Sequence, residues 1–453
     1  MKKYLSILLA ILFAAVFTAC GDASDDSGDS QIADSEEYVS EEFTGTVITM
    51  AGQRFSPETM AQVQSFNATN EHYRIEAIRF DEDDTTRLLT EIMAGAGPDI
   101  LYGYLVSCNM IEAMIARNML VDLWTLLDAD PELNREDFFQ NVLEARQSAD
   151  GSLPVVSNRF VVNTIVGMPE AVSHLDTWTV ADLFTVVQDA FEAGVTLPLG
   201  WHTTAEFMLH FILFHTGTEL IDLEAGVSNL ESQRFYDLLG LLAILPRNWE
   251  ETDIDFNVNE FELLRTGGQV LQVHPFFGPH SYEDYVSLVE DFTILGMPHV
   301  DGGIHVANLW SLMGININSE HPDVVWSFIR RFLAPNVRIT HAIPMRIDLY
   351  DEMTEDAMQV WQTDVTADGE EVALHWNTAS GLPLNGPRRA LTQEHADAHR
   401  ALVESVTHVP RIDERIWDII LEELQPFFAE QRTVEEAARI MQNRVQTLLN
   451  ERG

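Results

Sequence analysis

The segment 46–102 constrains the fold more than any other part of the chain, because short β-branched and apolar runs alternate there with amphipathic segments. Three of the runs predict strands, namely 46–50, 73–78 and 98–102. The segments between them predict helices, the first with Ser56 as N-cap and Pro57 at the first helical position. Strands and helices that alternate over short connections predict a parallel sheet with helices on both faces. In such sheets ligands bind beyond the carboxyl ends of the strands.

The rest of the chain adds strands and helices without an internal repeat. The apolar, β-branched stretch 153–166 predicts a strand that crosses between two domains. Shorter runs of the same kind predict strands at 270–273 and 292–295, and 308–317 is another apolar run. The last helix begins at a capping box formed by Thr433 and Glu436.

Acidic residues dominate the composition, with 72 Asp and Glu against 26 Lys and Arg and a formal net charge of −46. Such a surface repels DNA, RNA and anionic lipid headgroups, so we expect no nucleic-acid partner. The two lysines of the chain are Lys2 and Lys3. The remaining sequence therefore cannot build a Walker A loop or a pyridoxal Schiff base, and we expect no cofactor.

The first 19 residues have the layout of an export signal, in which Lys2 and Lys3 precede an apolar run that ends at Thr18-Ala19. Cys20 follows directly, and this arrangement resembles the lipobox of bacterial lipoproteins, which implies a lipid on Cys20. Residues 20–44 are acidic, Ser-rich and Gly-rich and predict a flexible tether. We expect a protein anchored by lipid on the extracellular face of a Gram-positive membrane, or in a Gram-negative periplasm. An ordinary secretory signal is the alternative.

Four segments of the exported chain resemble the extracellular solute-binding proteins of ABC importers, in particular the large carbohydrate-binding group that includes maltose-binding protein. They are, in order, 66–76 (FNATNEHYRIE), 94–101 (AGAGPDIL), 314–329 (GININSEHPDVVWSFI) and 428–450 (FAEQRTVEEAARIMQNRVQTLLN). The chain departs from the family pattern at Glu71 and His72, and again where Glu430-Gln431 replaces a glycine region.

The resemblance implies an α/β protein with the two-lobed periplasmic-binding-protein-like fold (type II). Each lobe would be a mostly parallel sheet flanked by helices, and a hinge would join the lobes. On this template residues 45–156 plus 300–340 form the first lobe, and residues 157–299 plus 341–453 form the second. The chain would cross between lobes near Val155-Val156, near Met297-Pro298 and after Pro335. A monomer would capture a sugar or oligosaccharide between its lobes and deliver it to the permease subunits in the membrane.

A sugar presents apolar C–H faces and a rim of hydroxyls, so its site needs aromatic rings together with short polar groups. The candidate ligand-binding residues that lie in loops or at strand ends are Arg54, Asp99, Tyr102, Tyr104, Asn158, Phe160, Trp201, Phe276, Phe277 and Trp310. The family likeness supports Tyr102 and the Phe276-Phe277 pair, because relatives present aromatic rings there. Asp99 is equally compatible with a structural turn, and Trp201 and Trp310 with core packing.

Metal binding, glycoside hydrolysis and the binding of a cationic solute would each require a different set of residues. His395 and His399 are four residues apart, as in a metal pair, but no third ligand is evident and HExxH is absent, so we predict no metal site. A secreted glycoside hydrolase would need two facing carboxylates, which no spacing reveals. Alternatively, the negative charge and the aromatic residues would suit a cationic solute, such as a polyamine or a quaternary ammonium compound.

Overall fold

The structure is a computed structural model that describes residues 43–81, 85–103, 109–256, 258–337, 339, 341–365, 371–377, 386–411 and 413–451. The predicted leader, Cys20 and nearly all of the predicted tether lie outside these residues. Within the described part of the chain, no helix combines the length and the apolar composition needed to cross a membrane.

The first sheet forms from the segment that the sequence predicts as alternating strands and helices. Its elements are β1 (Thr46–Gly52), α2 (Pro57–Thr69), β2 (Tyr73–Arg79), α3 (Thr85–Met93) and β3 (Ile100–Gly103). Strand β1 pairs in parallel with β2 and β3, and β10 (Leu312–Ile315) adds to β3 in antiparallel, which gives the order β10-β3-β1-β2. The predicted cap is confirmed, because the Ser56 hydroxyl accepts a hydrogen bond from Thr59 N.

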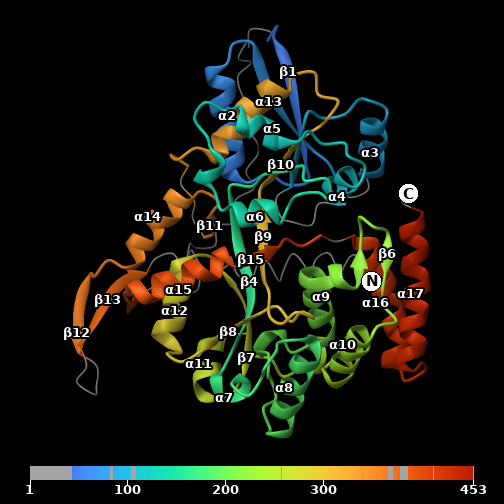
Figure 1. Ribbon diagram of the computed structural model, residues 1–453, viewed down its shortest axis with the longest axis vertical. Helices are drawn as coiled ribbons and strands as arrows, with labels where there is room; N and C mark the ends of the chain where they lie inside the picture. Colours follow the sequence, from blue (N-terminus) through green and yellow to red (C-terminus); the bar gives the residue numbers. More distant parts are fainter. Residues whose placement is uncertain are drawn as a thin grey trace, which may run out of the picture.

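Helices pack around this sheet in the upper part of Figure 1. They are α2, α3, α4 (Asn109–Ile115), α5 (Leu123–Asp128) and α13 (Pro322–Ile329). The ring of Phe66 in α2 meets the edge of Phe328 in α13 at 5.6 Å, and both side chains are buried. This contact joins two helices around the first sheet whose residues are 262 positions apart in the chain.

The second sheet is arranged around β4 (Arg159–Gly167). Four strands pair with β4 in antiparallel, namely β7 (Leu271–Phe276), β8 (Thr293–Gly296), β9 (His305–Trp310) and β11 (Ile343–Pro344). Strand β15 (Val406–His408) pairs in parallel with β9. The pairing differs from the mostly parallel sheet that the family likeness implies, because β4 leads away from the first lobe whereas β9 returns towards it (Figure 1).

The remaining elements lie around and below β4 in Figure 1. The helices are α6 (Gln140–Glu144), α7 (Pro169–Val172), α8 (Val180–Glu192), α9 (Ala205–Thr216), α10 (Gln233–Ile244), α11 (Glu260–Thr266), α12 (Pro279–Leu288), α14 (Ile347–Ala357), α15 (Gln393–Glu404), α16 (Glu414–Phe428) and α17 (Val434–Asn450). Two small antiparallel sheets comprise β5 (Ile221–Asp222) with β6 (Val227–Ser228), and β12 (Gln362–Val365), β13 (Glu371–Asn377) and β14 (Gly386–Arg389). The predicted capping box at Thr433 and Glu436 is confirmed.

The chain passes from the second sheet to the first at Ser311, between β9 and β10. Ser311 has a φ of 57°, a left-handed conformation that allows the sharp change of direction. Sequence analysis placed this crossing near Met297-Pro298, but Met297 pairs with Ile304 inside the connection from β8 to β9. The crossing comes later in the sequence than predicted because β9 still belongs to the second sheet, where it pairs with Arg159 to Asn163 of β4. The wider division of residues between the lobes remains a prediction.

Alternation along β4 sends neighbouring side chains to opposite faces. Phe160 and Val162 belong to a large core that also contains Phe276, whereas Ile165 belongs to a second core with residues of α8, α9 and α10. Both edges of β4 are paired, and every one of its nine residues is buried. The lower half of β4 therefore has core on both of its faces.

Because adjacent side chains of a strand point to opposite faces, truncating Phe276 and truncating Phe277 should lower the stability of the protein by different amounts. Phe276 is fully buried and Phe277 is only partly buried. Phe276→Ala leaves a cavity and should lower the free energy of unfolding by about 3–5 kcal/mol, whereas Phe277→Ala should cost roughly 1 kcal/mol. Urea unfolding of both variants measures the difference. Equal losses would contradict the assignment of the two rings to opposite faces.

Candidate ligand-binding site

One face of the second sheet carries an unusual set of side chains at the end nearest the first lobe. Strand register places Arg159 opposite Trp310 and Val161 opposite Asn308, so these four side chains share a face. Asn163 lies two residues further along β4 on the same face. We call this set, together with Phe277, the strand face.

Aromatic rings supply the apolar part of the strand face. Phe276 pairs with Val162, so Phe277 emerges beside Val161, and its ring lies 6.1 Å from that of Trp310 at an interplanar angle of 69°. Val161, Trp310 and Ala342 form a small buried cluster against which Phe277 packs. The two rings thus meet edge to face above an apolar floor, separate from the two large cores.

Polar atoms without hydrogen-bond partners supply the polar part of the strand face. The buried atoms that make no hydrogen bond include Arg159 Nε, Asn163 Nδ2, Asn308 Oδ1 and Trp310 Nε1. More than nine in ten buried polar groups in native proteins are paired, so the four unpaired atoms on this face make it a candidate site for a polar ligand. Three of these atoms belong to donor groups and one is an acceptor.

The first lobe contributes a carboxylate to the same place. Glu58, in the first turn of α2, has its Oε2 4.0 Å from the Arg159 guanidinium. Partial burial raises the pKa of Glu58, but hydrogen bonds from its own backbone N–H and from Ser56, together with the charge of Arg159, outweigh it and lower the pKa. Glu58 is therefore ionised at neutral pH and forms a weak electrostatic link between the lobes.

Four of the predicted aromatic residues fall into two groups on opposite sides of the second sheet. Phe277 and Trp310 lie on the strand face. Phe160 and Phe276 point to its reverse side, where both are fully buried in the large core. In this structure those two rings are packing residues, because each lies one position away from a residue of the face.

Tyr102 belongs to β3 of the first sheet and is not part of the strand face. Its side chain is fully buried and its ring stacks on Phe55 at 5.3 Å. The hydroxyl accepts from Thr59 Oγ1 at 3.0 Å and donates to Ser311 Oγ at 3.2 Å. Tyr102 thus ties the start of α2, and with it Glu58, to the crossing at Ser311.

Asp99 precedes β3, at the end of the sheet opposite to the carboxyl ends of its parallel strands. Its carboxylate accepts hydrogen bonds from Thr49 N and Thr49 Oγ1 at 2.9 and 3.1 Å and from Ser319 Oγ at 2.7 Å. These bonds hold β1, β3 and the segment after β10 together. In this structure Asp99 has a structural role, which was the alternative to ligand binding that the sequence allowed.

The remaining predicted ligand-binding residues lie in different parts of the chain. Arg54 is exposed in the connection from β1 to α2. Asn158 directly precedes β4, its carbonyl accepts from Met345 N at 2.9 Å, and its Oδ1 has no partner. Tyr104 lies outside the described residues. The structure therefore brings Phe277 and Trp310 together, and Asn158 directly precedes Arg159 of the strand face in the chain.

Trp201 lies at the far end of the second lobe. The segment before it bonds through Pro198 O to Leu271 N, and Leu271 pairs with Gly167 at the end of β4. Gly167 is eight residues from Arg159, which is about 26 Å along a strand. Trp201 contacts Phe256 at 6.1 Å and accepts a hydrogen bond from Trp249 Nε1 at 3.1 Å. It is not part of the strand face.

The sequence alone did not indicate the polar members of the strand face, namely Arg159, Asn163 and Asn308, or the approach of Glu58 to them. For Arg159 and Asn163 the sequence did contain a pattern. Both interrupt an apolar run, and because they are four positions apart they lie on the same face of a strand. Asn308 needed the pairing of β9 with β4, and Glu58 needed the approach of the two lobes.

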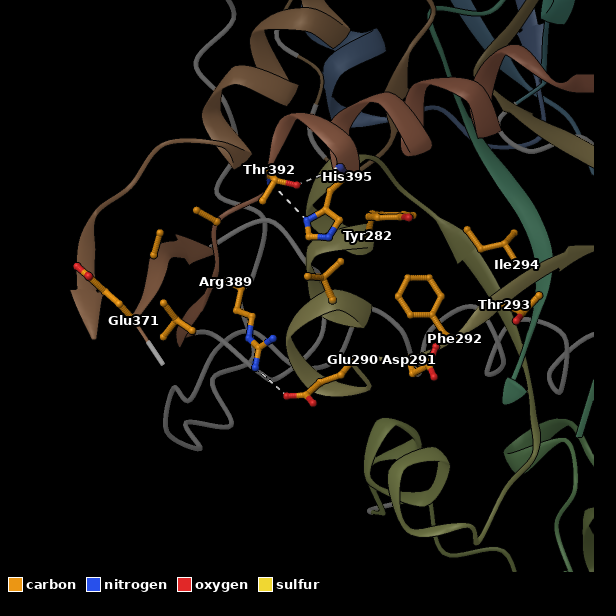
Figure 2. A pocket seen from close by; sticks show the side chains of 14 residues that line it. Tyr282, Glu290, Asp291, Phe292, Thr293, Ile294, Glu371, Arg389, Thr392 and His395 are labelled. Atoms are coloured by element: carbon orange, nitrogen blue, oxygen red, sulfur yellow. Dashed lines mark hydrogen bonds and ion pairs between the residues drawn. The ribbon is translucent and has the colours of Figure 1, made fainter. Parts of the chain in front are cut away.

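A separate hollow of about 850 Å³ lies on the outer side of α12. Figure 2 shows its wall formed by Tyr282, Phe292 and Ile294, with Arg389 and Glu290 joined in an ion pair of 2.7 Å. The atoms without partners that distinguish the strand face do not occur among the residues that line this hollow. The hollow is therefore a weaker candidate for specific binding.

The two histidines considered for metal binding have other partners. His399 is fully buried with Nδ1 2.7 Å from the Tyr350 hydroxyl, and burial lowers its pKa to about 3. His395 Nδ1 lies 3.4 Å from Thr392 N at the start of α15. Among the described residues, no three His, Cys, Asp or Glu side chains gather closely enough to hold a metal ion.

Solved structures share this fold. The sugar-binding protein MalE from Xanthomonas citri matches with a TM-score of 0.52 at 17% identity, over 90% of this chain and 98% of that one. The cyclic α-maltosyl-1,6-maltose binding protein from Arthrobacter globiformis matches with a TM-score of 0.51 at 14% identity, over 90% and 100%. An extracellular solute-binding protein of family 1 from Alicyclobacillus acidocaldarius gives 0.51 at 14%, over 89% and 98%.

These likenesses confirm the predicted two-lobed periplasmic-binding-protein-like fold. At identities of 14–17% they establish the fold alone. No protein-family model and no curated protein matches the chain. The strand face, by contrast, is an observation on this chain's own residues.

The surroundings of Trp201 generate a prediction about pH. Glu260 is buried, and its carboxylate accepts from Trp201 N at 3.0 Å and from Gln272 Nε2 at 3.3 Å. Burial raises the pKa of Glu260 to about 7, although these hydrogen bonds oppose the shift. Because the folded pKa exceeds the unfolded value near 4.5, this group's contribution to stability is complete below pH 4.5 and is lost as the pH rises through 7.

Glu260→Gln should therefore stabilise the protein more at pH 8 than at pH 5, by up to about 3 kcal/mol from the size of the shift. Urea unfolding at the two pH values measures this difference. Glu262→Gln, on the same helix with a side chain 55% exposed, is the control and should show no such change. A gain from Glu260→Gln that does not depend on pH would contradict the prediction.

Proposed function

We propose that this protein is the substrate-binding component of an ABC importer and that it captures a sugar or oligosaccharide between its two lobes. The strand face carries the proposal. Two aromatic rings and several unpaired polar atoms lie together on one sheet, and Glu58 of the other lobe approaches them. Solved structures with this fold include proteins described as binding sugars, which supports the proposal.

The chemistry of the strand face suits a sugar ring. The faces of Trp310 and Phe277 match the apolar C–H surface of a pyranose. Asn163, Asn308 and the Trp310 indole offer donors and an acceptor at the edge of the rings, where hydroxyls would lie. A hydrophobic floor with a few polar groups that fix orientation is the usual composition of a small-molecule site.

Lobe closure follows from the position of the charged residues. Arg159 belongs to the second lobe and Glu58 to the first. A ligand that contacts both lobes favours the closed state, since a ligand held by one lobe has no differential affinity for closure. The closed protein would then dock on the permease, which hydrolyses ATP elsewhere.

The leader and Cys20 support an anchored, extracellular protein, and we propose that it acts as a monomer. With a net charge of −46 the surface is repelled by anionic lipids, so the proposed anchor is the lipid on Cys20. In a Gram-negative cell the same protein would lie in the periplasm. Its polypeptide partners would be the transmembrane subunits of the importer.

The alternative functions fit the strand face less well. Strands β4, β7 and β9 contain no Asp or Glu, so they offer no pair of carboxylates for glycoside hydrolysis. The solved relatives are described as binding proteins. A polyamine or quaternary ammonium ligand would meet the positive charge of Arg159, which opposes its binding.

Truncation of the rings should weaken sugar binding selectively. Trp310→Ala and Phe277→Ala should each reduce the affinity for a bound saccharide at least tenfold, because each removes stacking area from the sugar. Isothermal titration calorimetry with the best saccharide from a thermal-shift screen measures the loss.

The matched control is Trp201→Ala, which removes a partly buried tryptophan near the Gly167 end of β4, and Gly167 is about 13 Å along the strand from Asn163, the nearest β4 member of the strand face. Its affinity for the saccharide should stay within about twofold of the parent. Equal losses in all three variants, or unchanged affinity in Trp310→Ala and Phe277→Ala, would reject the strand face as the site.

A further inference from the structure

We infer that the ligand of the strand face carries a carboxylate and is an acidic saccharide, such as a uronic acid or an oligosaccharide that contains one. The inference rests on the proposed function and narrows its ligand class. It follows from the state of Arg159, whose positive charge lies in the face without adequate compensation.

The Arg159 guanidinium is buried and makes no hydrogen bond to the described residues. Its side chain is 10% exposed, Nε has no partner, and Glu58 lies 4.0 Å away, beyond hydrogen-bonding distance. The ring of Trp310 lies 5.7 Å from Cζ and supplies only a cation–π contact. Five N–H donors in a fixed fork are thus available at the edge of the aromatic pair.

A carboxylate satisfies this group better than hydroxyls do. Hydroxyls would accept hydrogen bonds from the fork but leave the buried positive charge uncompensated, which is costly. A carboxylate matches the fork with two parallel hydrogen bonds and cancels the charge. The strands around Arg159 supply no acidic residue of their own, since β4, β7 and β9 contain neither Asp nor Glu.

Glu58 does not fill this role in the structure. Its side chain is 61% exposed, so the carboxylate keeps most of its contact with water while it remains near Arg159. A bound carboxylate would take its place beside the guanidinium. Glu58 would then repel the ligand, so its charge should weaken the binding of an acidic sugar.

The net charge of −46 does not prevent such binding. At physiological ionic strength the Debye length is about 8 Å, so exposed acidic residues beyond that distance are largely screened. Arg159 acts at contact distance inside a face that excludes most of the water. Local charge therefore decides which ligand is favoured.

The test compares matched pairs of neutral and acidic sugars. Full-length protein in detergent is titrated by calorimetry with glucose and glucuronate, galactose and galacturonate, and galactobiose and digalacturonate. At least one acidic member should bind ten or more times tighter than its neutral partner in 50 mM NaCl, and the ratio should fall in 500 mM NaCl.

Two variants with opposite expected effects assign the preference to Arg159. Arg159→Gln should reduce the acidic-to-neutral affinity ratio to within about twofold, and Glu58→Gln should raise that ratio. Arg265→Gln, at an ion pair with a side chain 55% exposed, is the control and should leave the ratio unchanged. Circular dichroism melts verify that each variant folds, and Glu58→Gln keeps the test valid if Arg159→Gln does not.

The outcomes separate the inference from the proposed function. Neutral sugars that bind as tightly as their acidic partners, or tighter, would overturn the inference and leave a sugar receptor in place. A preference for acidic sugars that survives in Arg159→Gln would also overturn it. Failure of every saccharide, neutral and acidic, to bind would overturn both.

Discussion

Strand β4 is paired along both of its edges, and this pairing fixes the direction of every side chain on it. Towards the first lobe it pairs with β9 and β11, and further down it pairs with β7 and β8. A slip of one residue would exchange the two faces and bury Arg159 in the large core in place of Phe160. The strand face exists because this register is held from both sides.

Strand β9, the partner of β4, connects the candidate site to the crossing between the two sheets. The β9 partner of Arg159 is Trp310, and the next residue, Ser311, is where the chain turns into the first sheet. Tyr102 bonds to Ser311 and to Thr59, which holds the start of α2 and therefore Glu58 over the strand face. A ligand between the lobes would contact residues that lie next to the hinge in sequence, so its binding would act directly on closure.

Much of the fold could be predicted because local signals determined it. The segment from β1 to β3 follows hydrophobic periodicity, caps and short connections, and the Ser56 cap is formed as expected. The candidate site was harder, because every residue of β4 is buried and hydrophobicity does not distinguish its faces. Whether Phe276 or Phe277 meets the core depends on register with β4, and the approach of Glu58 to Arg159 joins residues 101 positions apart. Neither fact is contained in a local pattern.

A crystal structure with a bound saccharide would test most directly whether the ligand joins the two lobes across the strand face. The account predicts a sugar ring stacked on Trp310 or Phe277, with polar contacts to Arg159 and, from the other lobe, to residues at the start of α2. A sugar held by one lobe alone, or bound in the hollow beside Tyr282 and Phe292, would contradict it.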